Sequence, residues 1–393
     1  ITYRNGAHYE GNCINNKFNG LIKLTLSNSD TYQINYIDGK INGYGIQIYD
    51  NGNVQEGNWI SGKCHGRVSH TYLDGKYEGE YKNELFNGQG IYTYNDGSKY
   101  DGTWSNGKYH GKGMYSKLSK LGFEVYVGHF VNGIRQGYGV CTSKIFEYNN
   151  INTYDGEWFN NNFHGKGKHT FKYHFVFEGN FLNGDKSGYG ICKYHDKSIY
   201  EGNWLNNKYH GKGKLTNTDG STYEGNFVND ERTGYGRYVY NNGNVYEGEW
   251  LKGKYNGKGK LTIVSKDKTE VYEGLFSDGI RNGPGICITT LNITRIKEST
   301  MEGSWVNSEF NGNGKITYHD GSVKEGNFIN GELSGFGVHI LPSGWKYEGE
   351  WLNGKYHGNG KETSVKGKVT NGIWINGEKQ KVPISKYFAQ VFK

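Results

Sequence analysis

Histidine recurs at one position of a repeated sequence pattern, and this arrangement invites a zinc-site interpretation. The column comprises His65, His110, His164, His210 and His357, and asparagine fills the same position at Asn256 and Asn311. Neighbouring histidines of this column are separated by two repeats. If each repeat forms two strands, they lie about 20 Å apart at roughly 4.8 Å per strand. Zinc ligands bind one ion at about 2 Å, so these histidines cannot share a metal within one chain. We therefore predict a structural role and no metal site, and leave open a metal between two copies.

Lysine also forms columns, and these residues could bind an acidic partner. The candidate stripe comprises Lys108, Lys112, Lys166, Lys208, Lys212, Lys254, Lys258, Lys260 and Lys355. Such a stripe suits acidic lipid headgroups or the acidic tails of tubulin. The alternative is a solvated face in which the lysines alternate with the glutamates of the repeat. The net charge of +7 is small for 393 residues, so we predict no nucleic-acid binding.

Motifs that carry catalysis are missing from the sequence. It contains no Gly-x-x-x-x-Gly-Lys-Ser/Thr phosphate loop, no His-Glu-x-x-His zinc motif, and no serine-nucleophile elbow or kinase signature set. An open array of repeats also offers few closed pockets that exclude water. We predict that the chain is not an enzyme, has no catalytic residues and needs no cofactor.

Cysteine usage and hydropathy indicate the compartment. Cys13, Cys64, Cys141, Cys192 and Cys287 form no Cys-x-x-Cys pair, and the last three occupy one repeat position. We interpret them as small apolar strand residues in a reducing compartment. No apolar run approaches the ~20 residues of a membrane span, and no signal peptide is visible. We expect a cytoplasmic protein, and leave open a targeting segment before Ile1.

A 23-residue pattern built on Tyr-Glu-Gly-x-Trp places all of these columns. Its marker glycines are Gly11, Gly57, Gly79, Gly102, Gly128, Gly156, Gly179, Gly202, Gly225, Gly248, Gly274, Gly303, Gly326, Gly349 and Gly372. Asn35 fills the one missing slot, which gives about 16 units. A period of this length indicates an open array in which each unit mainly contacts its neighbours.

Each unit is predicted to form one β-hairpin. In the segment from Tyr223 to Phe227, alternation puts Tyr223, Gly225 and Phe227 on one face of a strand. Pairs such as Asn106-Gly107 suit a two-residue turn, because both residues there take positive φ. The return strand carries alternating glycines, and we expect aromatic rings from the neighbouring strand to cover that bare backbone.

Aromatic residues two positions after the marker glycines form the predicted repeat core. They are Trp59, Trp104, Phe130, Trp158, Phe181, Trp204, Phe227, Trp250, Phe276, Trp305, Phe328, Trp351 and Trp374. Trp and Phe alternate along most of this column. The alternation makes the working unit a pair of hairpins, about 46 residues long.

The predicted fold is all-β: an elongated, twisted, single-layer antiparallel sheet of about 16 consecutive hairpins, followed by a short C-terminal helix. At ~4.8 Å per strand the ribbon would be ~150 Å long, with one aromatic face and one charged face. The array spans residues 1–377, and residues 378–393 form a tail. The segment 131–141 aligns with 277–287, which indicates a duplicated six-hairpin block over about 99–244 and 245–377.

Two pairs of insertions recur in the duplicated blocks. They are Ser116–Val125 with Thr142–Thr153, and Ile263–Glu270 with Thr289–Thr300. We expect enlarged loops on one long edge of the sheet. They are either tolerated surface insertions or equivalent docking points for a partner that repeats along its own axis.

The C-terminal segment changes period. Its apolar residues Ile384, Tyr387, Phe388, Val391 and Phe392 have helical spacing, and a proline stands where the helix would begin. We predict a short helix that covers the edge of the last hairpin. Docking to a partner or to a membrane surface is the alternative.

The repeat resembles the MORN (membrane occupation and recognition nexus) repeat family. The segments from Tyr200 to Gly213 and from Tyr347 to Gly360 are close to its motif, and the resemblance covers nearly the whole chain. The family includes cytoskeletal scaffolds of protists, radial-spoke and other ciliary proteins, junctophilins that bridge membranes, and modules of plant phosphoinositide kinases and a histone methyltransferase. The chain departs from the motif at Cys13, Asn35 and Asn371, as expected of terminal caps.

The resemblance and the long array together favour a non-enzymatic scaffold. We expect it to space and dock partner proteins in a ciliary axoneme, for example like a radial-spoke protein, or in the cortical cytoskeleton. A homodimer that closes the aromatic face stays open. One alternative is a peripheral membrane-binding or membrane-tethering module for acidic phospholipids, and another is the regulatory half of a larger enzyme.

Overall fold

A computed structural model of the chain describes residues 1–148 and 150–380. The predicted C-terminal helix lies outside these residues. The chain divides into two compact units. The first is Ile1–His195 with Leu205–Asn207, and the second is Asp196–Trp204 with the residues from Lys208 onward.

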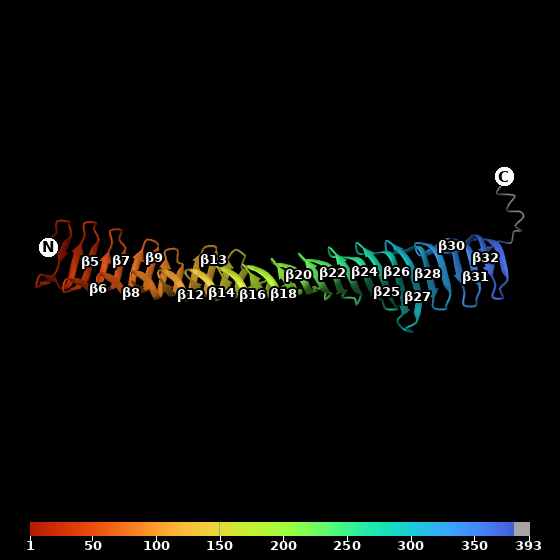
Figure 1. Ribbon diagram of the computed structural model, residues 1–393, viewed down its shortest axis with the longest axis horizontal. Helices are drawn as coiled ribbons and strands as arrows, with labels where there is room; N and C mark the ends of the chain where they lie inside the picture. The colour runs from red at the N-terminus through yellow and green to blue at the C-terminus, as the bar shows by residue number, and fades with distance from the viewer. Residues whose placement is uncertain (149, 381–393) are drawn as a thin grey trace, which may run out of the picture. The chain divides into compact units, whose positions relative to one another are not determined.

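The first unit is an open antiparallel sheet, drawn from red to green in Figure 1. Its strands are β1 (His8–Glu10), β2 (Cys13–Ile14), β3 (Lys17–Phe18), β4 (Gly20–Thr25), β5 (Thr31–Ile37), β6 (Lys40–Ile48), β7 (Val54–Ile60), β8 (Lys63–Tyr72), β9 (Gly75–Lys82), β10 (Leu85–Tyr94), β11 (Lys99–Ser105), β12 (Lys108–Ser119), β13 (Gly122–Val131), β14 (Ile134–Ile145), β15 (Asn150–Phe159), β16 (Asn162–Phe171), β17 (Phe175–Leu182) and β18 (Asp185–Tyr194). From β4 onward each strand pairs with the next one in the chain.

The second unit repeats this arrangement, from green to blue in Figure 1. Its strands are β19 (Ile199–Leu205), β20 (Lys208–Thr216), β21 (Thr222–Val228), β22 (Glu231–Val239), β23 (Val245–Leu251), β24 (Lys254–Val264), β25 (Lys268–Ser277), β26 (Ile280–Leu291), β27 (Lys297–Val306), β28 (Glu309–Tyr318), β29 (Val323–Ile329), β30 (Glu332–Ile340), β31 (Lys346–Leu352), β32 (Lys355–Thr363), β33 (Val369–Ile375) and β34 (Glu378–Lys379). The all-β hairpin array is confirmed in both units.

Turn chemistry sets the register of each hairpin. Asn106 and Gly107 both have positive φ, 50° and 77°, and directly connect β11 to β12. This is the two-residue turn that the sequence predicts, because its twist matches that of the strands. At the other edge the turns are longer: the amide of Ser98 donates to Asp96 Oδ1 at 2.8 Å, and Gly97 takes φ 83°.

A tyrosine closes a backbone gap inside most hairpins, and Phe177 takes its place over Gly179 and Gly190. The register between β23 and β24 shifts after the Gly248–Gly259 pair, so that Glu249 has no partner on β24. Tyr246 lies across both glycines: a Cβ on Gly259 would stand 2.5 Å from its hydroxyl. That hydroxyl donates to the carbonyl of Glu249 at 2.8 Å. The ring thus fills the space that the glycines leave and satisfies a carbonyl beside the bulge.

The glycine cover of the return strand is the one that the sequence predicts, because Tyr246 of β23 lies over Gly259 of the neighbouring strand β24. The same ring also covers the marker glycine of its own strand, Gly248, two residues after it. The side chains of residues i and i+2 share a face of a strand. The bulge between Gly248 and Trp250 provides the carbonyl that fixes the ring.

The predicted repeat core lies on one face of each unit. All of its Trp and Phe side chains, from Trp59 to Trp374, are at most 5% exposed. The indole of Trp250 donates to the carbonyl of Gly236 on the preceding strand at 3.1 Å, and that of Trp158 reaches Gly139 in the same way at 2.9 Å. These indoles therefore tie their hairpins to the preceding ones, whereas the indole Nε1 atoms of Trp59 and Trp351 are buried without a hydrogen-bond partner in the described chain.

The predicted enlarged loops are mostly strand, which corrects the prediction. Residues 116–119 of β12 pair with residues 122–125 of β13, and β14 continues to Ile145. In the second unit, β24, β25 and β26 are lengthened in the same way. The inserted residues extend existing ladders, where their backbone groups find partners.

The first repeat is irregular. β1 pairs directly with β4, while β2 and β3 form a separate small hairpin. Asn35, in the glycine slot, donates its amide to the carbonyl of Tyr44 at 3.1 Å. An atypical terminal repeat covers the end of the array. The division of the chain into two compact units does not test the predicted duplication of a six-hairpin block, which stays a prediction.

Candidate docking troughs

The face opposite the aromatic core carries the candidate site. Alternation along the strands brings the acidic residue of each Tyr-Glu-Gly step to this face, together with the middle residue of each Gly-x-Gly step. That middle residue is an exposed aromatic in several hairpins: Tyr44, Tyr138, Tyr189, Tyr235 and Phe336 are all more than half exposed. Tyr138, Tyr189, Tyr235 and Phe336 each stand as a ridge between hairpins that carry lysine or asparagine at this position, whereas the hairpin after Tyr44 carries Arg67.

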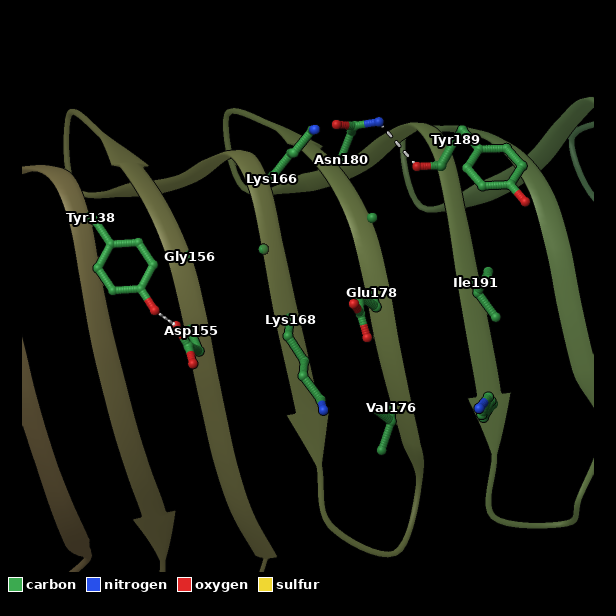
Figure 2. A pocket seen from close by; sticks show the side chains of 13 residues that line it. Tyr138, Asp155, Gly156, Lys166, Lys168, Val176, Glu178, Asn180, Tyr189 and Ile191 are labelled. Atoms are coloured by element: carbon green, nitrogen blue, oxygen red, sulfur yellow. Dashed lines mark hydrogen bonds between the residues drawn. The ribbon is translucent and has the colours of Figure 1, made fainter.

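Two ridges enclose a trough in the first unit (Figure 2). Tyr138 of β14 and Tyr189 of β18 stand at its ends, and Gly156, Gly167 and Gly179 form its floor. Its volume is about 680 Å³. The hydroxyl of Tyr138 donates to Asp155, and this hydrogen bond raises the pKa of the phenol. The bond holds the Tyr138 ring over the trough.

The same trough recurs in the second unit between β22 and β26, with a volume of about 910 Å³. Tyr235 takes the place of Tyr138 and donates to Glu247 Oε1 at 2.9 Å. At the far end Pro284 replaces the second tyrosine, and Ile286 lies beside it. Both troughs therefore combine one anchored tyrosine, a glycine floor and an apolar far wall.

Some of the predicted lysine stripe lines these troughs. Lys166 lies in the first trough, opposite Asn180 of β17. Lys258 and Lys260 line the second trough. Lys260 has Glu247 on one neighbouring strand and Glu273 on the other, so the glutamates of the repeat flank its charge. Lys112 and Lys212 occupy the same repeat position as Lys166, opposite histidine or asparagine.

The other lysines of the stripe lie elsewhere. Lys108, Lys208, Lys254 and Lys355 each begin a return strand at the short-turn edge, and all are exposed. Lys254 forms a surface ion pair with Asp278 at 3.5 Å. The predicted stripe is therefore two separate rows, one along an edge and one within the troughs.

A column of cations on the aromatic face escaped the sequence prediction. In most hairpins with Trp, the second residue after the short turn is aromatic, and it can stack on the covering tyrosine, as Tyr255 does on Tyr246 at 3.6 Å. Cys64 and Lys379 are the exceptions in the hairpins of Trp59 and Trp374. In four of the five hairpins with Phe the same position holds a cation, namely Arg135, Lys186, Arg232 or Arg281, and in the hairpin of Phe328 it holds Leu333. This alternation of an aromatic residue and a cation falls at a fixed position of the repeat, so the sequence did contain a signal for the cation column.

The cations of this column pack against the rings. The guanidinium of Arg135 lies 4.7 Å from the centroid of Tyr126 and 5.3 Å from that of Trp158. The ammonium of Lys186 lies 3.9 Å from the Phe175 centroid, and burial lowers the pKa of this lysine. Stacking on the negative faces of aromatic rings offsets part of the cost of taking a cation out of water.

The histidine column forms no metal site among residues 1–148 and 150–380, where no group of three or more His, Cys, Asp and Glu side chains could hold an ion. The Nδ1 atoms of His110, His164, His210 and His357 are buried without a hydrogen-bond partner in the described chain.

The cysteines are free thiols. Cys64, Cys141, Cys192 and Cys287 are buried in strands, while Cys13 is exposed. Burial raises the pKa of Cys64 to about 11. A high pKa keeps the thiol protonated and unreactive, which agrees with a packing role for the buried residues.

Comparison with known proteins agrees with this architecture. A family model described as MORN repeat matches residues 35–54, 56–67, 77–99, 100–117, 126–145, 154–172, 177–199, 200–222, 223–245, 246–268, 272–289, 302–323, 325–346 and 347–369. No curated protein matches the chain. Within the part of the chain that the structure describes, no helix is long and apolar enough to cross a membrane. MORN repeats serve in protein interaction or membrane association and are generally non-catalytic. With these matches covering most of its length, the chain belongs to the MORN repeat family.

Proposed function

We propose that this chain is a structural scaffold that spaces and docks partner proteins in a ciliary axoneme or in the cortical cytoskeleton, and that it carries out no catalysis itself. The observation that carries the proposal is the recurrence of one trough, with the same anchored tyrosine, in both units. A protein with two equivalent sites can engage two copies of one partner, and simultaneous binding raises the overall affinity.

The composition of the troughs supports a protein as the partner. Exposed tyrosine beside glycine and aliphatic side chains is typical of binding hot spots, because an aromatic ring buries much area at little entropic cost. Tyr138, with 57% of its surface exposed, has area to bury on binding. The glycine floor lets the backbone of a partner approach closely.

The charge pattern favours a protein over an acidic membrane. Lysines that bind acidic lipids usually form clusters of one sign. Here Lys168 faces Glu178 on β17 and Asp155 on β15, and Lys260 is flanked in the same way in the second unit. A mixed-sign surface of this kind suits a partner with charges of both signs.

Paired trough variants test the docking role. Tyr138→Ala combined with Tyr235→Ala removes both ridges, whereas Tyr173→Ala removes an exposed tyrosine from a turn outside both troughs. We expect tagged wild-type protein and the Tyr173 variant to stay in the detergent-insoluble cytoskeletal pellet, and the double variant to be released. Equal retention of all three proteins would refute docking through the troughs.

Membrane association is the second candidate, and Lys112, Lys166, Lys212 and Lys258 favour it, because their cross-strand partners are neutral. Flotation with phosphatidylserine vesicles tests it. Binding that disappears in moderate salt, and in the variant with Lys212, Lys258 and Lys260 changed to Gln, would establish this function instead of the scaffold.

A further inference from the structure

We propose that Arg232, on the aromatic face of the second unit, is a binding site for a carboxylate, supplied by an aspartate or glutamate side chain of a partner protein. Arg232 belongs to the cation column, is half-buried, and lies opposite Phe227 in the hairpin of β21 and β22. Its guanidinium stacks on Tyr238 at 4.7 Å, and on Tyr223 and Trp250 at 5.3 Å.

Two other hairpins of this chain show which counterion the position takes. In the first unit Arg135 forms an ion pair with Glu124, and in the second unit Arg281 forms one with Glu270. In both hairpins the glutamate stands two residues before the covering tyrosine, on a strand that the insertion has lengthened. The chain therefore uses a carboxylate as the natural partner of this guanidinium.

The hairpin of Arg232 lacks that carboxylate. Its strand is short, and the residue two positions before Tyr223 is Ser221, whose hydroxyl is already bonded to Asp219 at 2.6 Å. Within the described residues, no Asp or Glu oxygen lies within ion-pair distance of Arg232, whereas Arg135 and Arg281 each have one. A half-buried guanidinium without an anion is costly, and an anion bound from outside would lower that cost.

The space beside Arg232 is open, and it contains two cations, of which Lys254 is paired at the surface with Asp278. A hollow of about 350 Å³ is lined by Arg232 and Lys254 together with Tyr238, Tyr240 and Trp250, and its lining contains no acidic residue. The hollow beside Arg135 differs, because Glu124 and Asp96 line it. Charge complementarity with the guanidinium, which is unpaired among the described residues, therefore selects an acidic side chain for the hollow of Arg232.

A fluorescent hexaglutamate peptide tests the site, with hexaglutamine as the uncharged control. We expect Arg232→Gln to weaken hexaglutamate binding by about tenfold or more, as for the loss of a charge-assisted contact. Lys212→Gln removes one exposed charge from the opposite face and should change the affinity less than about twofold. Equal losses in the two variants, or none in Arg232→Gln, would overturn the proposal.

Two further variants guard against misfolding. Ser221→Glu with Tyr238→Cys reproduces the Glu270–Cys287 arrangement around Arg281, so it should block the site while Arg232 keeps its charge. Glu270→Gln frees Arg281 and should add hexaglutamate binding. No gain in Glu270→Gln, or phosphate binding at Arg232 without hexaglutamate binding, would also overturn the proposal. This inference rests on the proposed function in one respect, that the partner is a protein. A negative result with the hexaglutamate peptide would leave the outcome of the cytoskeletal fractionation unaffected.

Discussion

Gly259→Ala tests the idea that each tyrosine fills the space over a glycine pair. A Cβ at this position would lie 2.5 Å from the hydroxyl of Tyr246 and 2.7 Å from its ring carbons. The ring cannot retreat, because it stacks on Tyr255 at 3.6 Å and meets Phe276 edge-on at 5.2 Å. Overpacking costs about 1–3 kcal/mol. Loss of the hydrogen bond to Glu249 adds about 1 kcal/mol, so we expect a loss of about 2–4 kcal/mol.

Amide hydrogen exchange of β23 and β24 measures this loss, because a repeat array can open locally instead of melting as one unit. Gly243→Asn is the control: it has open space and φ 86°, which asparagine tolerates, so protection should change by less than about 1 kcal/mol. Combining Gly259→Ala with Tyr246→Ala should cost clearly less than the sum of the two single changes. If the free-energy losses of the two single changes simply add in the double variant, the idea that Tyr246 fills the space over the glycine pair is refuted.

Other predictions concern single interactions. Arg281→Met leaves Glu270 in a partly buried site without its partner, so urea denaturation should show a loss of about 3 kcal/mol that Glu270→Met largely restores. Trp250→Phe removes the hydrogen bond to the preceding strand and should cost about 1 kcal/mol in the same assay; an unchanged midpoint would contradict the tie between hairpins. Burial lowers the pKa of His70 to about 4, below its unfolded value near 6.5, so stability should fall as the pH drops from about 6.5 toward 4, and His70→Phe should flatten that profile. Iodoacetamide at pH 8 should label Cys13 alone in the folded protein, and mass spectrometry showing rapid labelling of the other thiols would contradict their packing role.

The sequence predicted the hairpins because their signals are local. Asn106-Gly107 can form few turns other than a two-residue one, and a 23-residue period leaves no other place for the strands. Alternation around each marker glycine was enough to place Trp104 and Phe130 on the buried face.

Other features depend on neighbours that the sequence does not reveal. The cation column was missed, because a charged residue is rarely expected on an aromatic face. The ring contacts of Arg135 explain its place there. The extended strands were predicted as loops, because residues 116–125 show no clear alternation. The troughs result from exposed tyrosines on strands that are not adjacent in the sheet.

One measurement tests the scaffold most directly: fractionation of native cells after detergent extraction, with this chain followed by antibody. The account predicts retention in the insoluble cytoskeletal pellet through a wash in moderate salt, because partner proteins hold the chain through buried contacts. Release by detergent alone would contradict it, since a membrane would then hold the chain.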